Sequence, residues 1–128
     1  MKYLNIVFCM LMILFAAVQY NDPDTMFWIV IYLIPALWTG LAAFRPKLFR
    51  TTLPMTLLGA CVVVALIGSI YFWPGEPGFW RKDVWWESET AREGMGMMIA
   101  TVALIVASVT VWLARATGRG QQDVADQR

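Results

Sequence analysis

The stretch "LPMTLLGACVVVALIGSIYFW", residues 53–73, decides the fold of this chain because it contains no charged residue. A run of about 18 or more apolar residues is long enough to cross a bilayer as a helix. Three more such uncharged runs occur at residues 3–20, 26–44 and 95–114. Their apolar character is continuous instead of alternating, which disfavours a β-barrel, and a lipid-exposed backbone satisfies its own hydrogen bonds in a helix. The sequence therefore predicts an all-α integral membrane protein with four transmembrane helices in two antiparallel hairpins.

The amino-acid composition is also typical of a chain that lies in the hydrocarbon layer of a membrane. Of the 128 residues, 59% are hydrophobic and 15% are charged, whereas soluble domains have about 45–50% and about 25%. We expect the first run to be a retained helix; the alternative is a cleaved signal peptide, since Lys2 precedes it, but "FAAVQY" is a poor cleavage site. The net charge of +1 argues against a nucleic-acid partner.

The distribution of basic residues predicts the orientation of the chain. Lys and Arg in short loops mark the cytoplasmic side. An N-terminus inside the cell puts seven of the ten basic residues there: Lys2, Arg45, Lys47, Arg50, Arg115, Arg119 and Arg128. Only Arg81, Lys82 and Arg92 then lie outside, with seven of the nine acidic residues. We expect both termini to be cytoplasmic, in a bacterial inner (plasma) membrane.

The domain organisation follows from these spans. Residues 1–114 are expected to form the four-helix transmembrane domain, with an outer loop at 74–92, and residues 115–128 a polar, disordered cytoplasmic tail. The Trp-rich loop is either an interfacial segment on the outer leaflet or an ordered loop with anchoring aromatic residues. Small residues repeat along the fourth helix and predict its packing face against the bundle, or else a homodimer seam. They are Gly96, Ala100, Ala103, Ala107, Thr110 and Ala114.

Helix capping explains part of the polar sequence at the outer helix ends. Asp22 is the expected N-cap of the second helix, with Pro23 at its first position and Asp24 in its first turn. Thr90 and Glu93 have the spacing of a capping box at the start of the fourth helix. Capping by itself therefore accounts for several of these side chains without any ligand.

Seven polar residues near these two helix starts form the candidate site: Gln19, Asn21, Asp22, Asp24, Glu89, Arg92 and Glu93. The predicted topology brings both helix starts to the same surface. Our preferred interpretation is an ion pair between Arg92 and Asp22 or Asp24 that holds the hairpins together. The alternatives are an anionic headgroup at Arg92 and a Ca²⁺ or Mg²⁺ site. The candidate metal ligands are Asp22, Asp24, Glu89 and Glu93.

Two motifs resemble a known family. Gln19-x-Asn21-Asp22-Pro23-Asp24, followed by Trp28-x-x-x-Tyr32-x-x-Pro35, is similar to the signature of the transmembrane protein 220 family. Glu89-x-x-Arg92-Glu93-x-x-Gly96 resembles the second segment of that family. The resemblance implies a small four-helix membrane protein, and it implies no reaction, cofactor or ligand.

The residue inventory favours a protein that is not an enzyme. The chain has no histidine, and its cysteines, Cys9 and Cys61, both fall within apolar runs and are expected to be free thiols. Nucleophilic and zinc-dependent catalysis therefore lack their usual groups, and we expect no cofactor. We expect an accessory or structural subunit whose acidic outer face binds a membrane-protein partner, a second copy of the chain or a lipid headgroup. The alternatives are a site for a divalent cation or small ligand and, more remotely, an enzyme using paired carboxylates.

Overall fold

The computed structural model describes residues 1–21 and 23–128, so the predictions for Asp22 lie outside the described residues, as do those for the side chain of Asn21. The described part is built from helices and turns. The elements are α1 (Lys2–Ala17), the 3₁₀ turn η1 (Val18–Asn21), α2 (Thr25–Phe44), the 3₁₀ turn η2 (Pro46–Arg50), α3 (Thr52–Tyr71), α4 (Lys82–Glu87) and α5 (Glu89–Asp126).

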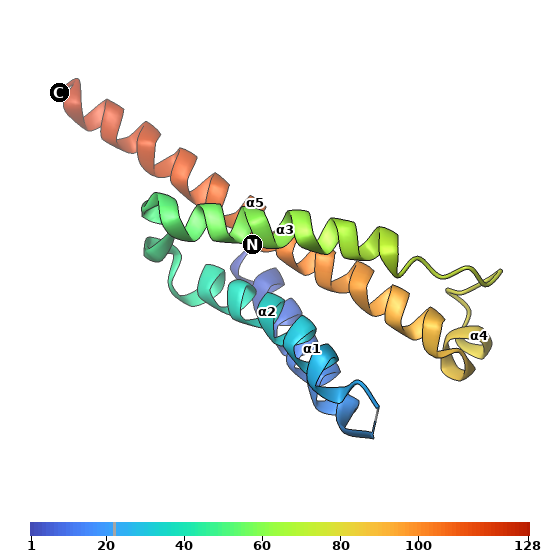
Figure 1. The fold of residues 1–128 in the computed structure, drawn as a ribbon. Helices are drawn as coiled ribbons and strands as arrows, with labels where there is room; N and C mark the ends of the chain where they lie inside the picture. The colour runs from blue at the N-terminus through green and yellow to red at the C-terminus, as the bar shows by residue number, and fades with distance from the viewer. Residues whose placement is uncertain (22) are drawn as a thin grey trace.

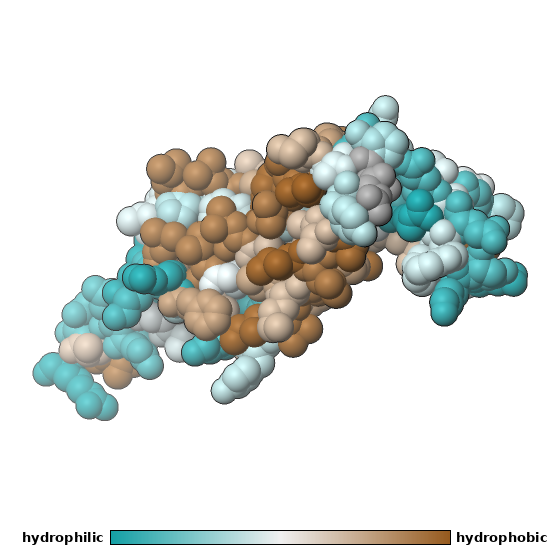
Figure 2. Space-filling view, turned by 90° about the horizontal axis from the view of Figure 1, so that it is seen from below, coloured by the Kyte–Doolittle hydropathy of each residue, from teal (hydrophilic) through white to brown (hydrophobic). Residues whose placement is uncertain are grey.

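Four helices in the described residues are long and apolar enough to cross a membrane: α1 continued by η1, α2, α3 and α5. Apolar side chains form a broad band across the middle of the molecule, and polar side chains gather at its two ends (Figure 2). This distribution is the one that a hydrocarbon layer flanked by water selects. The predicted all-α fold with four spanning helices is confirmed.

Helix α5 is the centre of the bundle. α1 packs along α2, α3 packs along α5, and α5 also contacts α1 and α2. η1, the start of α2 and the short helix α4 lie at one end of the molecule, which we call the α4 end (Figure 1). η2 and the C-terminal part of α5 lie at the opposite end, which we call the η2 end. Towards the α4 end, the pair formed by α1 and α2 diverges from the pair formed by α3 and α5 (Figure 1).

Small residues on α5 explain why three helices can approach it. Ala103 and Ala107 are completely buried, and Ala100 is nearly so. Lipid provides no hydrophobic drive for helices to associate, so close packing through small side chains is what stabilises the bundle. Ala100 and Ala103 pack among α1 and α2, while Ala107 packs beside α3 and η2. The small stripe therefore packs within the bundle, as predicted, over most of its length; Ala114 is exposed.

Polar contacts connect α5 to its neighbours inside the apolar band. The Asn5 side chain is fully buried, and its Nδ2 donates to the hydroxyl oxygen of Thr110 at 2.7 Å and to the Met1 carbonyl at 2.9 Å. The hydroxyl oxygens of Ser69 and Thr101 lie 2.8 Å apart and connect α3 to α5. Asn5 thus links the first helix to the last.

The limits of α5 differ from the prediction at both ends. The expected capping box at Thr90 and Glu93 is wrong, because Ser88 is the N-cap and its Oγ accepts the backbone N–H of Ala91 at 3.3 Å. The earlier start buries Ala91 completely. At the other end the expected disordered tail is also wrong: α5 continues to Asp126 and projects alone beyond the bundle (Figure 1). With 38 residues its length is about 57 Å, well beyond the roughly 30 Å of a bilayer core.

The start of α2 also differs from the prediction. α2 begins at Thr25, with Asp24 at the N-cap position and without a side-chain capping hydrogen bond, so Asp24 is not in the first turn. Instead, the hydroxyl of Thr25 donates to the carbonyl of Gln19 at 2.9 Å. This bond joins the start of α2 to η1 across the turn. α1 likewise ends at Ala17, earlier than expected, because the chain tightens into η1.

Candidate functional site: an aromatic cavity at the α4 end

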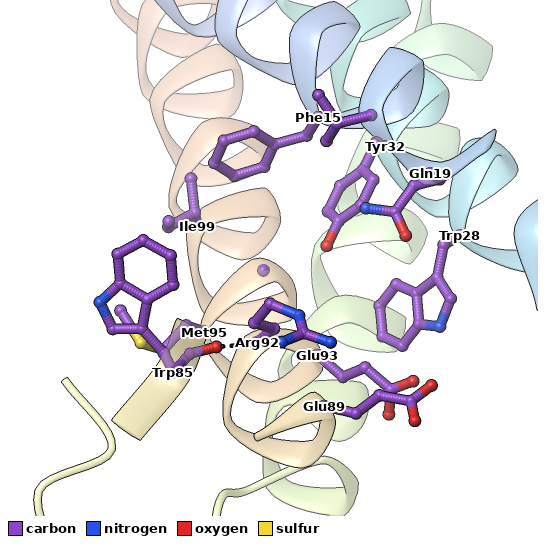
Figure 3. Close-up of a pocket in the computed structure, with 12 residues that line it drawn as sticks. Phe15, Gln19, Trp28, Tyr32, Trp85, Glu89, Arg92, Glu93, Met95 and Ile99 are labelled. Atoms are coloured by element: carbon purple, nitrogen blue, oxygen red, sulfur yellow. Dashed lines mark hydrogen bonds between the residues drawn. The ribbon is translucent and has the colours of Figure 1, made fainter. Parts of the chain in front are cut away.

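A cavity of about 300 Å³ lies at the α4 end, between the two diverging helix pairs. Its walls come from α1 and η1, from α2, and from α4 with the first turns of α5. The lining residues are Phe15, Val18, Gln19, Trp28, Tyr32, Trp85, Glu89, Arg92, Glu93, Met95, Gly96 and Ile99. Most of them are apolar, and four aromatic rings are among them (Figure 3).

Trp28 and Tyr32 form a rigid aromatic wall. They stand one helical turn apart on α2, both are buried, and their ring centroids lie 5.8 Å apart. Phe15 of α1 meets Tyr32 edge-on at 5.4 Å, and Phe72, at the end of α3, meets Trp28 at 5.2 Å. The rings of Trp28 and Tyr32 are thus each packed against a ring from another part of the chain, and the fold itself holds the wall in place.

Gly96, which lines the cavity, allows α2 to approach α5 closely. A methyl group added at Gly96 would overlap the hydroxyl oxygen of Tyr32 and lie 3.0 Å from its Cζ atom. Gly94 has a similar role two residues earlier, because a methyl group there would lie 2.5 Å from the carbonyl oxygen of Phe72. The two glycines let the start of α5 pack against α2 on one side and against the end of α3 on the other.

The charged part of the cavity comes from the first turns of α5. Glu89 and Glu93 are four residues apart, so they share one face of the helix. In Figure 3 both carboxylates lie on the Trp28 side of the cavity, and the Arg92 guanidinium lies between Trp28 and Trp85. Arg92 Nη1 donates to the carbonyls of Trp86 at 2.6 Å and Trp85 at 3.3 Å. Arg92 therefore holds the C-terminal carbonyls of α4 and places Trp85 over the cavity.

Glu76 fixes the start of α5 from the loop. One carboxylate oxygen accepts the Ser88 hydroxyl at 2.5 Å, and the other accepts the Thr90 hydroxyl at 3.1 Å. Since Ser88 is also the N-cap of α5, the loop, the cap and the first turn are connected through one carboxylate. This arrangement positions Glu89 and Glu93 relative to α4.

The structure brings four of the seven predicted site residues together. Gln19, Glu89, Arg92 and Glu93 all line the cavity. Asp24 is exposed at the start of α2 and is not among the lining residues. Asp22 and the side chain of Asn21 lie outside the described residues.

The ion pair that we expected between Arg92 and Asp24 is not present, because the Arg92 guanidinium binds the carbonyls of α4 instead. The other version of that pair involves Asp22, which the structure does not describe. Within residues 1–21 and 23–128, no three Asp, Glu, Cys or His side chains are grouped as a metal site would require. The described carboxylates Asp24, Glu89 and Glu93 therefore do not form the expected cluster by themselves.

Sequence reasoning about polar residues missed the aromatic half of the site. Phe15 is one of many apolar residues in its span, and Trp85 lies in a loop whose fold we left open. A signal did exist for Trp28, Tyr32 and Gly96, since all three belong to the two motifs named above. The structure explains that grouping: both motifs meet at this cavity.

The fold and this cavity define a class, the helical membrane proteins with several spans whose helix ends enclose a small aromatic site at one membrane surface. The chain belongs to transmembrane family 220, because the family model described as "Transmembrane family 220, helix" matches residues 11–109. All the lining residues of the cavity fall within that region.

A related protein agrees with this assignment. The chain is 32% identical over 91 residues to Transmembrane protein 220 of the frog Xenopus laevis. The aligned region covers 71% of this chain and 49% of the frog protein, so the chain spans about half the length of the curated relative that it matches. No solved structure matches the chain.

Proposed function

We propose that this chain is a membrane protein without catalytic activity that binds the zwitterionic, amine-bearing headgroup of a phospholipid in the cavity at the α4 end. One observation carries the proposal: the two family motifs, far apart in the sequence, line a single cavity whose lining combines aromatic rings with charged side chains. Helix ends of a membrane protein lie at the depth of the lipid headgroups, so this is the layer in which such a ligand is found.

The charges of the lining residues favour a cationic group. Glu89 and Glu93 together outweigh Arg92, and among residues 1–21 and 23–128 no other charged residue lines the cavity. Trp28, Tyr32, Trp85 and Phe15 supply aromatic faces, which attract ammonium groups through cation–π interactions. Arg92 has five N–H donors, and those on Nη2 and Nε are the ones that a neighbouring phosphate would accept.

The size of the cavity fits a headgroup. Its volume of about 300 Å³ is at the lower end of the roughly 300–1,000 Å³ that is usual for small-molecule sites. A headgroup fits this space while the acyl chains remain in the surrounding lipid. The apolar lining residues Val18 and Ile99 are compatible with such an amphiphile.

The orientation of the molecule is part of this proposal. Most basic residues, among them Lys47, Arg50, Arg115 and Arg119, belong to the η2 end or to the helix beyond it. The positive-inside rule puts that end in the cytoplasm and the cavity on the opposite surface. A bacterial inner (plasma) membrane and a membrane-protein partner or second copy of the chain, both expected above, stay predictions; the relative from Xenopus laevis comes from a eukaryote.

Native mass spectrometry of the detergent-solubilised chain tests the proposal. We expect retained adducts of phosphatidylethanolamine or phosphatidylcholine, and a loss of at least about tenfold in adduct affinity for the Glu89→Gln, Glu93→Gln double variant. Glu87→Gln, Asp83→Asn is the matched control, because both residues are exposed and neither lines the cavity. Equal adducts in the wild type and the cavity variant would refute the proposal. Stabilisation by Ca²⁺ or Mg²⁺ without lipid would favour the cation alternative instead.

A further inference from the structure

A second cavity lies at the η2 end, where basic residues from two distant segments converge. It has a volume of about 610 Å³ and lies between η2 and α5. Lys47 and Arg50 enter it from η2, and Arg115 and Arg119 enter it from α5. Among the residues that the structure describes, no carboxylate lines it, so the cavity is strongly positive.

The local structure explains why these four side chains meet. Pro46 begins η2 after the single residue Arg45, which follows the end of α2, and η2 packs against α5. Phe49 anchors the turn. Only 2% of its surface is exposed, and its ring centroid lies 5.9 Å from the ring centroid of Trp38. Arg115 and Arg119 are one turn apart on the continuous α5 helix, so they point to the same side.

The four cations have no carboxylate partner in the described part of the chain. Within residues 1–21 and 23–128, Arg81 and Asp83 form the ion pair, and they lie at the α4 end of the molecule. Asp123 follows Arg119 by one turn on α5, yet it does not line the cavity. Gathering like charges around one cavity without counter-charges is unfavourable, and an anion in the cavity removes that repulsion.

We infer that this cavity binds the phosphate group of an anionic phospholipid. Arginine guanidinium groups match phosphate oxygens in a bidentate geometry, and basic pockets between membrane helices are suited to acidic headgroups. Phe49 and Val111 also line the cavity, and both belong to the buried apolar cluster between η2, α3 and α5. A lipid contacts the basic side chains through its phosphate and the apolar residues through its acyl chains. A free phosphate ion contacts only the basic side chains.

The experiment measures binding of phosphatidylglycerol to the full chain in detergent, by native mass spectrometry, beside phosphatidylcholine and inorganic phosphate. The test variant is Arg50→Gln, Arg115→Gln. The control variant, Lys82→Gln, Arg128→Gln, removes two charges from exposed residues that do not line this cavity. Thermal unfolding without lipid is recorded for both, and Arg115→Lys serves as a milder variant that keeps the charge.

We expect phosphatidylglycerol to bind the wild type and the control variant alike, and to bind the test variant at least about tenfold more weakly, because charge-assisted hydrogen bonds are lost. Arg115→Lys should lose less. The inference is overturned if the test variant binds as the wild type does, or if the control loses as much as the test variant. It is also overturned if the test variant loses phosphatidylcholine, which is expected at the α4 end, as strongly as phosphatidylglycerol, or if inorganic phosphate at the same concentration displaces phosphatidylglycerol.

Discussion

Replacing Gly96 by alanine should destabilise the packing of α2 against α5 at the α4 end. The new methyl group would overlap the hydroxyl oxygen of Tyr32 and lie 3.0 Å from its Cζ atom, well inside ordinary van der Waals contact. Tyr32 cannot simply turn away, because it is buried and its ring is packed against Phe15 and Trp28. The overlap must therefore be relieved by moving α2 away from α5.

The size of the effect follows from two opposing terms. Overpacking of a filled core costs about 1–3 kcal/mol, and the rigid ring puts this site at the upper end of that range. Glycine to alanine inside a helix returns up to about 1 kcal/mol through helix propensity. The net destabilisation expected for Gly96→Ala is thus about 1–2 kcal/mol. Gly59→Ala is the matched control in a membrane helix, since nothing lies within 4 Å of a methyl group there.

The assay is thermal or denaturant unfolding in detergent, followed by far-ultraviolet circular dichroism, for a double-mutant cycle with Tyr32→Phe. Removing the hydroxyl oxygen removes the worst overlap, so Gly96→Ala should cost less in the Tyr32→Phe background. The reasoning is refuted if Gly96→Ala is as stable as Gly59→Ala, or if the cycle shows no coupling between the two positions.

Three further predictions use other contacts. Gly94→Ala should destabilise the protein in the same unfolding assay while Gly118→Ala does not, because only the first would press a methyl group against backbone, 2.5 Å from a carbonyl oxygen. A cycle of Asn5→Ala with Thr110→Val should give a coupling of about 0.6–1.7 kcal/mol, the range of hydrogen bonds between membrane helices; additive effects would contradict that contact. Arg92→Gln should speed hydrogen exchange in α4 while exchange in α3 stays unchanged, since it removes the donor to the α4 carbonyls; unaltered α4 exchange would argue against this role.

The spans were predictable because one physical requirement dominates them. Helices such as α3 must avoid charge along the whole hydrocarbon thickness, so their existence and approximate limits are visible in the sequence. The small residues of α5 were predictable for a related reason, since close approach in lipid needs small side chains. Asn5 was overlooked because a single amide near the end of a span is indistinguishable, in sequence, from one that faces the membrane surface.

The helix ends were harder to predict because several neighbouring residues can each serve as the N-cap. Ser88 and Thr90 are both good N-caps, and the structure identifies Ser88 as the cap because its Oγ accepts the Ala91 N–H, whereas the Thr90 hydroxyl donates to Glu76. The tail was expected to be disordered from its polarity alone. It contains few helix breakers apart from Gly118 and Gly120, and it continues a helix that has already formed, so no new nucleation is needed.

The candidate site was partly predictable for similar reasons. Topology brought the charged residues Glu89, Arg92 and Glu93 to the same end of the molecule as Gln19, and the cavity includes all four. The partner of Arg92 could not be predicted, because the short helix α4 and its free carbonyls arise from the way the loop folds back on α5. Side chains on a loop of unknown path cannot be paired from sequence spacing alone.

The most direct measurement of the central claim is the side of the membrane on which each end of the bundle lies. Single cysteines at positions 24, 89, 47 and 122, introduced after Cys9→Ala and Cys61→Ala, can be treated with a membrane-impermeant maleimide before and after permeabilisation. Positions 24 and 89 lie at the α4 end, and positions 47 and 122 line the basic cavity at the η2 end. We predict that 24 and 89 are labelled from outside in intact cells and that 47 and 122 react only after permeabilisation. Labelling of 24 and 89 from opposite sides would contradict the four-span fold and the single site built from its two motifs.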